Sequence, residues 1–341
     1  MSRRAFILGG SGQIGRAAAL NLLDAGWDVT VGQRHGGLPA DLQGRVTVTV
    51  LDREDDRALR DALANPFDAV IDTVAYNAAH ARQWLALQDR LGALAVISTG
   101  SVYVDDEGRT LGDGARYPIP LTENQRRALP GEADYSTNKV AMEDVLLAGA
   151  HIPLKILRPF AVHGPGSRAP REWWFLAQIL RGAGAIPLAY DGMSRFHTTA
   201  TANLAELTRV ALEQPGVHVL NAADPQALTV AEIGQAILTA MGSTATLAPF
   251  PGPPKGWKGR TPWSVEAPLV ADMSAAAALG YRPVTDYAAA APALCAALVA
   301  EADGKDWLSA FPGLAAYPPQ MFEAPPAKSP PLSAMVQLAK A

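Results

Sequence analysis

The chain has 341 residues, of which 49% are hydrophobic and 18% charged, and its formal net charge is −4. This length suits one large domain or two modest ones, and the scattered Lys and Arg residues argue against a nucleic-acid partner. The single cysteine, Cys295, excludes an intrachain disulfide and is expected to be a small buried apolar residue. No apolar run approaches the roughly 20 residues that a membrane span needs, so we expect no membrane partner and a cytoplasmic location.

Short apolar runs alternate with helix-like stretches over the first 160 residues. The runs predict strands at 5–8, 28–32, 46–51, 68–75, 94–99 and 154–159. The stretches between them predict helices at 14–25, about 54–64, 78–91 and 134–149. This alternation indicates βαβ units and therefore an α/β fold with a doubly wound parallel sheet, covered on both faces.

The second half of the chain is less regular. We predict a helix near 172–182, a helix near 201–213, a strand at 217–222, a Pro- and Gly-rich loop or lid at 244–268, and a helical stretch at 271–302. The Pro-rich tail, residues 311–341, is expected to be extended or disordered. The predicted organisation is a sheet domain of residues 1–165 with return elements at about 195–222, and a smaller C-terminal substrate-binding lobe of residues 166–194 and 223–310.

The stretch GGSGQIG lies between the first predicted strand and the first predicted helix. A helix N-terminus offers free N–H groups and a positive dipole end, and glycines let the backbone approach a pyrophosphate. A tight turn alone would also use glycines, but the strand–turn–helix context favours dinucleotide binding. The candidate cofactor residues of this loop are Gly9, Gly12, Gln13, Ile14 and Gly15.

The end of the second strand bears on the choice of cofactor. Sites that prefer NAD usually place a carboxylate there, on the adenosine ribose, but this chain has Gln33 and Arg34. Gln33 tolerates a 2′-phosphate and Arg34 could bind one, so NADP is the favoured cofactor and NAD is the alternative. Arg34 could instead be a solvated side chain with no ligand. Asp52, after the third strand, could accept from the adenine amino group or cap the helix that follows.

The stretch ADYSTNKVAMEDVLL predicts a helix in which Tyr135 and Lys139 project from one face. A phenol has a pKa near ~10, and a nearby ammonium, together with the positive charge of an oxidised nicotinamide, favours the phenolate and lowers that pKa toward working pH. Thr99 ends the fifth predicted strand, where its hydroxyl could hold a substrate oxygen against Tyr135. Ser98 and Ser101 are the alternatives, and capping of the strand end is a purely structural role for any of the three.

Four motifs, GGSGQIG, ISTGSVY, YSTNK and LRPFAVHGPG, occur in this order. Together they resemble the extended short-chain dehydrogenases/reductases of the NAD-dependent epimerase/dehydratase group, over roughly residues 4–240. The resemblance implies a Rossmann-type sheet and a catalytic triad of Thr99, Tyr135 and Lys139, with Lys139 also holding the nicotinamide ribose. The further cofactor contacts that it implies are Thr73, Val74, Ala75, Arg158, Pro159, Phe160 and Val162.

Other stretches, among them QRHGG and LDRED, resemble an atypical branch that includes the chloroplast stem-loop RNA-binding proteins, some members of which are not known for sugar chemistry. The 4,6-dehydratases of the family that this chain resembles carry an Asp-Glu pair where this chain has Gly100 and Ser101. Dehydration is therefore disfavoured, although Glu123 could still serve as the acid or base.

The favoured hypothesis is an NAD(P)-dependent epimerase or oxidoreductase acting on a carbinol carbon of a sugar or sugar nucleotide. The alternatives are an NADPH-dependent reductase of a non-sugar ketone or aldehyde, or a non-enzymatic cofactor-sensing or RNA-binding protein.

The substrate candidates are Ser101, Tyr103, Trp173, His197 and Arg260. Trp173 and Trp174 could stack on a base or a sugar, although core packing is the more probable role for at least one of them. A substrate diphosphate could be bound by Arg195, Lys258 and Arg260, together with His197.

The histidines show no metal-ligand spacing, so no metal is expected. The helices at 78–91 and 134–149 are compatible with a homodimer, and a monomer is the alternative.

Overall fold

The computed structural model describes residues 2–35 and 37–323, which fold as two compact units. Unit 1 comprises the described residues of Met1–Val162, Thr201–Ala223 and Ala271–Val284. Unit 2 comprises those of His163–Ala200, Asp224–Val270 and Thr285–Ala341. Residues 271–284, which we expected in the substrate lobe, therefore belong to the unit that carries the sheet.

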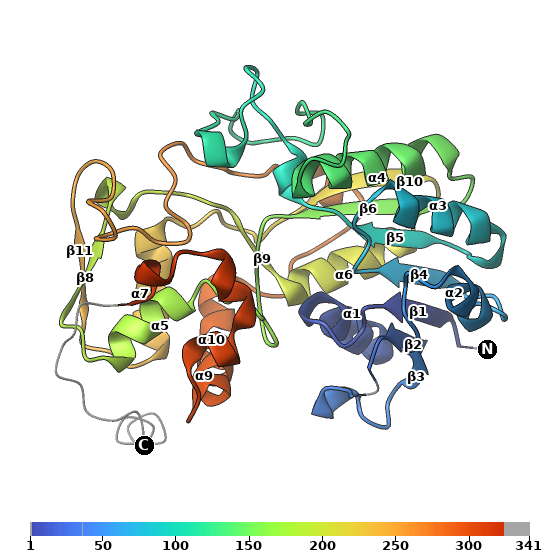
Figure 1. Cartoon of the computed structure of the whole chain (residues 1–341), viewed down its shortest axis with the longest axis horizontal. Helices are drawn as coiled ribbons and strands as arrows, with labels where there is room; N and C mark the ends of the chain where they lie inside the picture. Colours follow the sequence, from blue (N-terminus) through green and yellow to red (C-terminus); the bar gives the residue numbers. More distant parts are fainter. Residues whose placement is uncertain (1, 36, 324–341) are drawn as a thin grey trace. The chain divides into compact units, whose positions relative to one another are not determined.

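Unit 1 is built on a seven-stranded parallel sheet with the order β10-β6-β5-β4-β1-β2-β3 (Figure 1). Its strands are β1 (Arg4–Leu8), β2 (Asp28–Gln33), β3 (Thr47–Val50), β4 (Ala69–Asp72), β5 (Leu94–Ile97), β6 (Leu154–Pro159) and β10 (Val217–Ala222). The strand order reverses between β1 and β4, and in such sheets ligands bind beyond the carboxyl ends of the strands at that point. The predicted doubly wound parallel sheet is confirmed.

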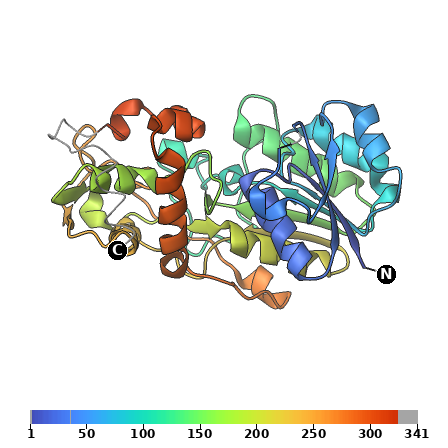
Figure 2. The same cartoon turned by 90° about the horizontal axis from the view of Figure 1, so that it is seen from below.

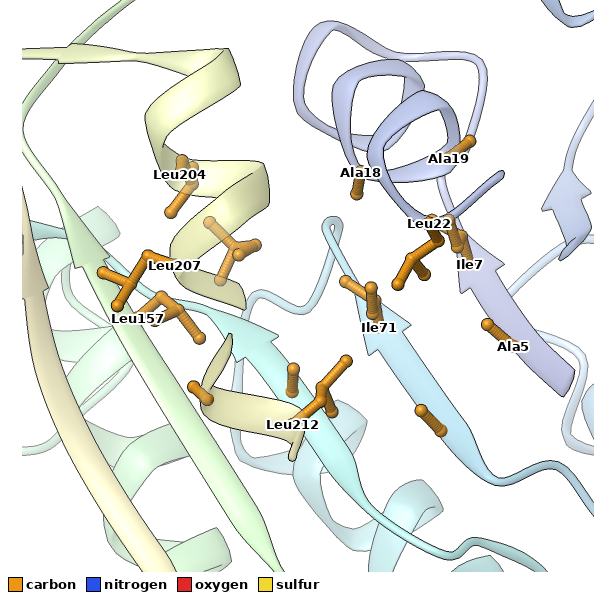
Figure 3. Close-up of a cluster of buried hydrophobic side chains, with 14 of the residues drawn as sticks. Ala5, Ile7, Ala18, Ala19, Leu22, Ile71, Leu157, Leu204, Leu207 and Leu212 are labelled. Atoms are coloured by element: carbon orange, nitrogen blue, oxygen red, sulfur yellow. The ribbon is translucent and has the colours of Figure 1, made fainter. Parts of the chain in front are cut away.

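Helices cover both faces of this sheet. They are α1 (Gln13–Asp24), α6 (Thr201–Leu212) and α8 (Ser274–Ala278) on one face, and α2 (Asp56–Ala62), α3 (Ala78–Leu87) and α4 (Tyr135–Gly149) on the other. Alternate residues of β1 face opposite ways, so Ile7 joins the core under α1 and α6 while Phe6 joins the core under α3 and α4. Figure 3 shows the core under α1 and α6, in which Leu22 of α1 and Leu204 of α6 pack on the strands.

Among its described residues, unit 2 contains four α-helices, a pair of short parallel strands and the short strand β9 (Thr198–Ala200) (Figures 1 and 2). The helices and the paired strands are α5 (Trp173–Leu180), β8 (Ala185–Leu188), α7 (Val230–Ala240), β11 (Thr246–Pro249), α9 (Tyr287–Ala302) and α10 (Trp307–Ala310). The chain leaves unit 1 through β7 (Ala161–His163) and returns to it through β9 (Thr198–Ala200).

Three predictions for the second half are wrong in part. The expected loop at 244–268 contains strand β11, and the expected helical stretch at 271–302 is interrupted between Ala278 and Tyr287. That interruption contains Gly280 at φ +85° and Pro283, neither of which favours a continuous helix. The predicted tail is not extended up to Glu323, because Phe311, Leu314 and Phe322 are buried and two 3-10 turns lie among them. Residues 324–341 lie outside the described part of the chain.

Two smaller expectations can be compared directly with the structure. Cys295 is buried in α9, as predicted for a small apolar residue. In the described residues, no helix combines the length and the apolar character that crossing a membrane requires.

Candidate active site

The glycine loop passes from β1 to α1 at the carboxyl end of the sheet. Gly9 takes a left-handed backbone conformation with φ +83°, and its N–H donates to Gly32 O at 2.8 Å. Gly12 is the N-cap of α1 and has no side chain with which to satisfy the first N–H groups. The first turn, Gln13 to Arg16, contains no carboxylate. The positive end of α1 could therefore receive an anionic group of a ligand.

Gly15 brings α1 against this loop. A Cβ at Gly15 would lie 2.3 Å from Gly9 O and 2.6 Å from Gly10 Cα, and a Cβ at Gly10 would lie 2.5 Å from a Val31 methyl carbon. Only glycine therefore allows this close packing of strand, loop and helix. The resulting cradle fits the pyrophosphate of a dinucleotide, the group for which the sequence predicted it.

At the end of β2, Gln33 is buried and Arg34 is exposed. The Gln33 amide donates to Gly37 O at 3.1 Å, while its Oε1 has no hydrogen-bond partner among the described residues. A buried acceptor without a partner is costly, and a ligand hydroxyl would satisfy it. Asp52 does not cap the next helix: it accepts from Glu54 N–H at 3.1 Å, and Asp55 is the N-cap of α2.

The segment after β4 lies beside the glycine loop. The Thr73 hydroxyl donates to Leu8 O at 3.0 Å, and a Cβ on Gly9 would lie 2.5 Å from Thr73 Oγ1. Val74 is 43% exposed, whereas Ala75 is buried. The structure thus places Thr73 against the loop and leaves the Val74 side chain accessible to a ligand of that loop.

A buried ion pair, which sequence reasoning missed, holds this segment in place. Asp72 ends β4, is 0% exposed, and accepts from Arg53 Nη1 at 2.7 Å and from Trp84 Nε1 at 2.6 Å. Its other oxygen accepts from Val74 N–H at 2.9 Å. The available signal was a carboxylate, Asp72, within the largely apolar predicted strand at 68–75.

Thr99, Tyr135 and Lys139 come together at the carboxyl end of β5. Asp134 caps α4 by accepting from Thr137 N–H at 2.8 Å, and this cap sets Tyr135 as the first residue of the helix. Tyr135 is 47% exposed, and the Thr99 side chain lies close enough to its phenol to lower the pKa of Tyr135. Lys139 lies one turn further along α4, with its Nζ 5.6 Å from the centre of the Tyr135 ring.

Lys139 is held by backbone carbonyls of the segment after β4 and of the end of β5. Its buried Nζ donates to Ala75 O at 2.6 Å and to Ile97 O at 2.8 Å. Burial lowers the pKa of Lys139 to about 8, against the smaller raising effects of Asp72 and Glu143. The lysine thus ties the segment after β4 to the end of β5 beneath the phenol.

The expectation for the ionisation of Tyr135 needs a correction. The protein atoms packed around the phenol raise the pKa of Tyr135 above its ordinary value, and the nearby Thr99 side chain opposes this by a smaller amount. Lys139 does not lower that pKa, because its ammonium is directed at the Ala75 and Ile97 carbonyls. On its own, the phenol is therefore better placed to keep a proton than to lose one.

Two predicted ligand contacts lie in a buried network instead. The Arg158 guanidinium donates to both Glu143 oxygens, at 3.0 and 2.6 Å, and to Tyr103 Oη at 3.0 Å. Tyr103 is 0% exposed and donates to Asn221 Oδ1 at 2.6 Å. Such a position does not support a substrate contact by Tyr103, and Arg158 would have to give up one of these partners to reach a cofactor.

The predicted contacts Pro159, Phe160 and Val162 lie at the end of β6 and just after it. The Phe160 ring stacks on Tyr103 with centroids 6.4 Å apart, and a Cβ on Gly100 would lie 2.4 Å from the Phe160 ring. Gly100 therefore makes room for Phe160. Pro159 is buried and Val162 is partly exposed, so only the latter has accessible surface for a ligand.

The substrate candidates of unit 2 are mostly structural. Trp173 is buried against Phe311, with ring centroids 5.0 Å apart, and buried His197 bonds Asp224 O through Nε2 at 2.9 Å. Neither position supports the predicted ligand contact. Arg260 is exposed, and its guanidinium lies 5.8 Å from the centre of the Trp257 ring.

Unit 2 has a pocket of about 540 Å³ among its described residues. Trp174, Trp257 and Phe322 line it together with Arg181 and Lys258. Both Trp173 and Trp174 are buried, at 6% and 4% exposed, and Trp174 also lines this pocket. Within the described part of the chain, His, Cys, Asp and Glu side chains form no group of three that could hold a metal ion.

The sequence matches the NAD dependent epimerase/dehydratase family over residues 5–223. The chain belongs to this family. The match spans the glycine loop, the Thr99, Tyr135 and Lys139 cluster and all seven strands of the parallel sheet. Among curated proteins, none matches the sequence.

Solved structures of epimerases and dehydratases share the fold at low sequence identity. The UDP-glucose 4-epimerase of Stenotrophomonas maltophila, with bound NAD and formylated UDP-arabinopyranose, is 18% identical with a TM-score of 0.68, covering 88% of this chain and 100% of that one. The Thermus thermophilus UDP-glucose 4-epimerase complex with NAD is 19% identical, with a TM-score of 0.65 and coverage of 86% and 98%. The dTDP-glucose 4,6-dehydratase of Bacillus anthracis, in complex with NAD, is 15% identical, with a TM-score of 0.65 and coverage of 89% and 99%.

Proposed function

We propose that this member of the family is an NAD(P)-dependent epimerase or oxidoreductase that acts on a carbinol carbon of a sugar or sugar nucleotide. One observation carries the proposal: an accessible phenol, Tyr135, lies near Thr99 and one helical turn from the buried Lys139, at the end of the sheet that also bears the glycine cradle. Such a phenol can exchange a proton with an alcohol oxygen, while a nicotinamide supplies the acceptor or donor of hydride.

The roles of the three residues follow from their contacts. Thr99 orients the substrate oxygen and the phenol toward one another through its hydroxyl. Tyr135 takes the alcohol proton during oxidation and returns it during reduction. Lys139 fixes the segment after β4 and the end of β5, and a positively charged ligand beside the phenol would supply the charge that favours the phenolate.

Dehydration is disfavoured by the residues next to Thr99. Elimination of water needs a positioned acid and a positioned base, and here the neighbours of Thr99 are Gly100 and Ser101. Glu123, the carboxylate that could have served instead, accepts from Asn221 N–H at 2.8 Å. Epimerisation or simple oxidoreduction therefore fits the residues better.

Two residues at the end of β2 favour opposite cofactors. The unpartnered Oε1 of Gln33 suits a ribose hydroxyl and hence NAD, whereas exposed Arg34 suits the 2′-phosphate of NADP. Hydrogen bonds to charged groups are about twice as strong as those between neutral groups. We therefore propose that NADP binds more tightly than NAD.

A second candidate is an NADPH-dependent reductase of a non-sugar ketone or aldehyde. The absence of a carboxylate at Gln33 and Arg34 favours it, since it would use NADPH as a co-substrate. A cofactor-sensing or RNA-binding role is less favoured, because it would not need the assembled Thr99, Tyr135 and Lys139. Assembly as a homodimer or monomer and a cytoplasmic location stay predictions.

The state of the cofactor separates the two enzyme candidates. The protein is purified without added nucleotide and denatured, and any released nucleotide is identified by mass spectrometry. Near-stoichiometric NAD or NADP supports epimerisation, in which the cofactor is recycled in place. An empty protein that binds NADPH supports the reductase, and an empty protein that binds neither nucleotide contradicts both.

A further inference from the structure

The pocket of unit 2 is built first of all by α5 and by the strand that follows it (Figure 1). Trp174, Gln178 and Arg181 are spaced so that they lie on one face at the end of α5. Ala185 and Pro187 alternate along β8 and share one face of that strand. These residues give the pocket one aromatic wall, one small apolar wall and a guanidinium.

The other walls come from parts of the chain that the family match does not reach. That match ends at residue 223, whereas the loop at 257–259 and the segment at 320–323 complete the lining. All the lining residues belong to unit 2. The volume of about 540 Å³ lies within the range of ~300–1,000 Å³ that is usual for small-molecule sites.

The loop wall presents an aromatic side chain on a fixed backbone. Lys255 and Lys258 donate to one another's backbone carbonyls at 3.2 Å in each direction, which closes a tight turn. Trp257 lies within this turn and is 43% exposed. Gly259 O accepts from Ala189 N–H at 3.1 Å, so the turn is fastened just beyond the end of β8.

The segment at 320–323 adds a second ring and positions the guanidinium. The Phe322 ring packs on Trp307 and Tyr317, with centroids 5.2 and 5.9 Å apart. Arg181 Nη1 donates to Phe322 O at 2.7 Å, and no other described residue bonds its Nε or Nη2. Burial lowers the pKa of Arg181, and the charge of Glu323 opposes this by a smaller amount. Arg181 therefore offers further N–H donors to a ligand of this pocket.

Cations outnumber carboxylates around the pocket. Lys258 lines it beside Arg181, and Lys255 and Arg260 lie within three residues of Lys258. In the described part of the chain, none of Lys255, Lys258 and Arg260 forms an ion pair, whereas Glu323 is the carboxylate of the lining. The surroundings therefore suit a ligand that carries a negative charge.

We propose that this pocket binds a planar aromatic carboxylate or sulfonate. The ring of the ligand packs on Trp174, Trp257 and Phe322, and its acidic group bonds Arg181 and Lys258. The inference does not rest on the proposed function, because the pocket uses none of the residues at the carboxyl end of the sheet.

Each part of the pocket discriminates against another class of ligand. A neutral apolar molecule would cover the cations without offering them a partner, which is costly. A saturated acid would forgo the stacking that three aromatic rings provide. A sugar or a nucleotide base would place polar edges against Ala185 and Pro187, whose side chains neither donate nor accept hydrogen bonds.

The test compares three probes of similar size by calorimetry on the full chain. Naphthoate is the aromatic anion, naphthamide has the same rings without the charge, and decalin carboxylate has the charge without the aromatic rings. The variants are Lys258→Gln, Trp257→Leu and Trp257→Phe. Lys305→Gln is the matched control, because Lys305 is an exposed lysine of unit 2 that does not line the pocket.

Wild type should bind naphthoate at least about 3-fold more tightly than either of the other probes. Lys258→Gln should weaken naphthoate by about 3- to 10-fold and naphthamide by less than about 2-fold, since only the former meets the ammonium. Trp257→Leu should weaken naphthoate by about 3- to 10-fold, and Trp257→Phe and Lys305→Gln by less than about 2-fold.

Three results would overturn the inference and leave the proposed function untouched. The first is a wild-type protein that shows no saturable binding of naphthoate or binds the three probes equally. The second is an equal effect of Lys258→Gln and Lys305→Gln on the Kd of naphthoate. The third is displacement of naphthoate by NADPH or UDP, which would place the probe in a nucleotide site instead of this pocket.

Discussion

Replacing Gly15 by alanine tests the glycine cradle most sharply. The added Cβ would lie 2.3 Å from Gly9 O and 2.6 Å from Gly10 Cα. Both are backbone atoms, so no side-chain rotation removes the overlap and α1 must move away from the loop. Overpacking costs roughly 1–3 kcal/mol, and the better helix propensity of alanine returns up to about 1 kcal/mol. We expect the free energy of unfolding to fall by about 1–2 kcal/mol.

The same movement displaces the first N–H groups of α1 from the pyrophosphate. Loss of one hydrogen bond to a charged group corresponds to roughly 10- to 100-fold in affinity, so the Kd of NADPH should rise by that factor. Urea unfolding and a titration of NADPH fluorescence measure the two effects. Gly184→Ala is the matched control, because a Cβ there meets nothing within 4 Å. A Gly15→Ala protein with the wild-type midpoint and Kd would refute the reasoning.

Three further predictions concern the residues around the cradle. Burial lowers the pKa of Lys139 to about 8, so between pH 8 and 10 the unfolded chain binds more protons than the folded one. As the pH rises through that window, the unfolding free energy of wild type should increase relative to that of Lys139→Met by up to about 1.4 kcal/mol per pH unit. Urea unfolding at several pH values measures this difference. The same pH dependence of the unfolding free energy in both proteins would contradict the prediction. Asp72→Asn leaves Arg53 buried without its counter-charge, so it should lower the unfolding free energy by about 3–5 kcal/mol, and a loss below about 1 kcal/mol would disprove the role of the pair. Arg34→Ala should weaken NADPH by roughly 10-fold and leave NADH nearly unchanged, as measured by fluorescence titration; equal losses for both would argue against a phosphate contact.

The sheet and the cradle were predictable because local sequence determines them. Buried parallel strands are short apolar runs, and a glycine loop between the first strand and the first helix has few other uses. The spacing of Tyr135 and Lys139 on one helix likewise predicted that they lie on one face. Strand β11 was missed because TLAP is largely exposed and ends in Pro249.

The partners of buried polar residues could not be predicted in the same way. Tyr103 bonds Asn221, and Asp72 bonds Arg53, across separations that only the folded chain closes. The ammonium of Lys139 was expected to act on the phenol, but the backbone carbonyls of Ala75 and Ile97 compete for it. The part of the tail before residue 324 was assigned from its prolines, whereas its buried Phe311 and Phe322 give it a place in unit 2.

Isotope transfer tests the central claim most directly. A sugar nucleotide with deuterium on the carbinol carbon is incubated with the protein and NADP, and the cofactor and the product are examined by mass spectrometry. The account predicts deuterium in the reduced cofactor or on the inverted carbon, with transfer at least about 100-fold slower in Tyr135→Phe, because general acid–base catalysis contributes roughly 10²–10⁴. No transfer by wild type, or equal transfer by Tyr135→Phe, would contradict it.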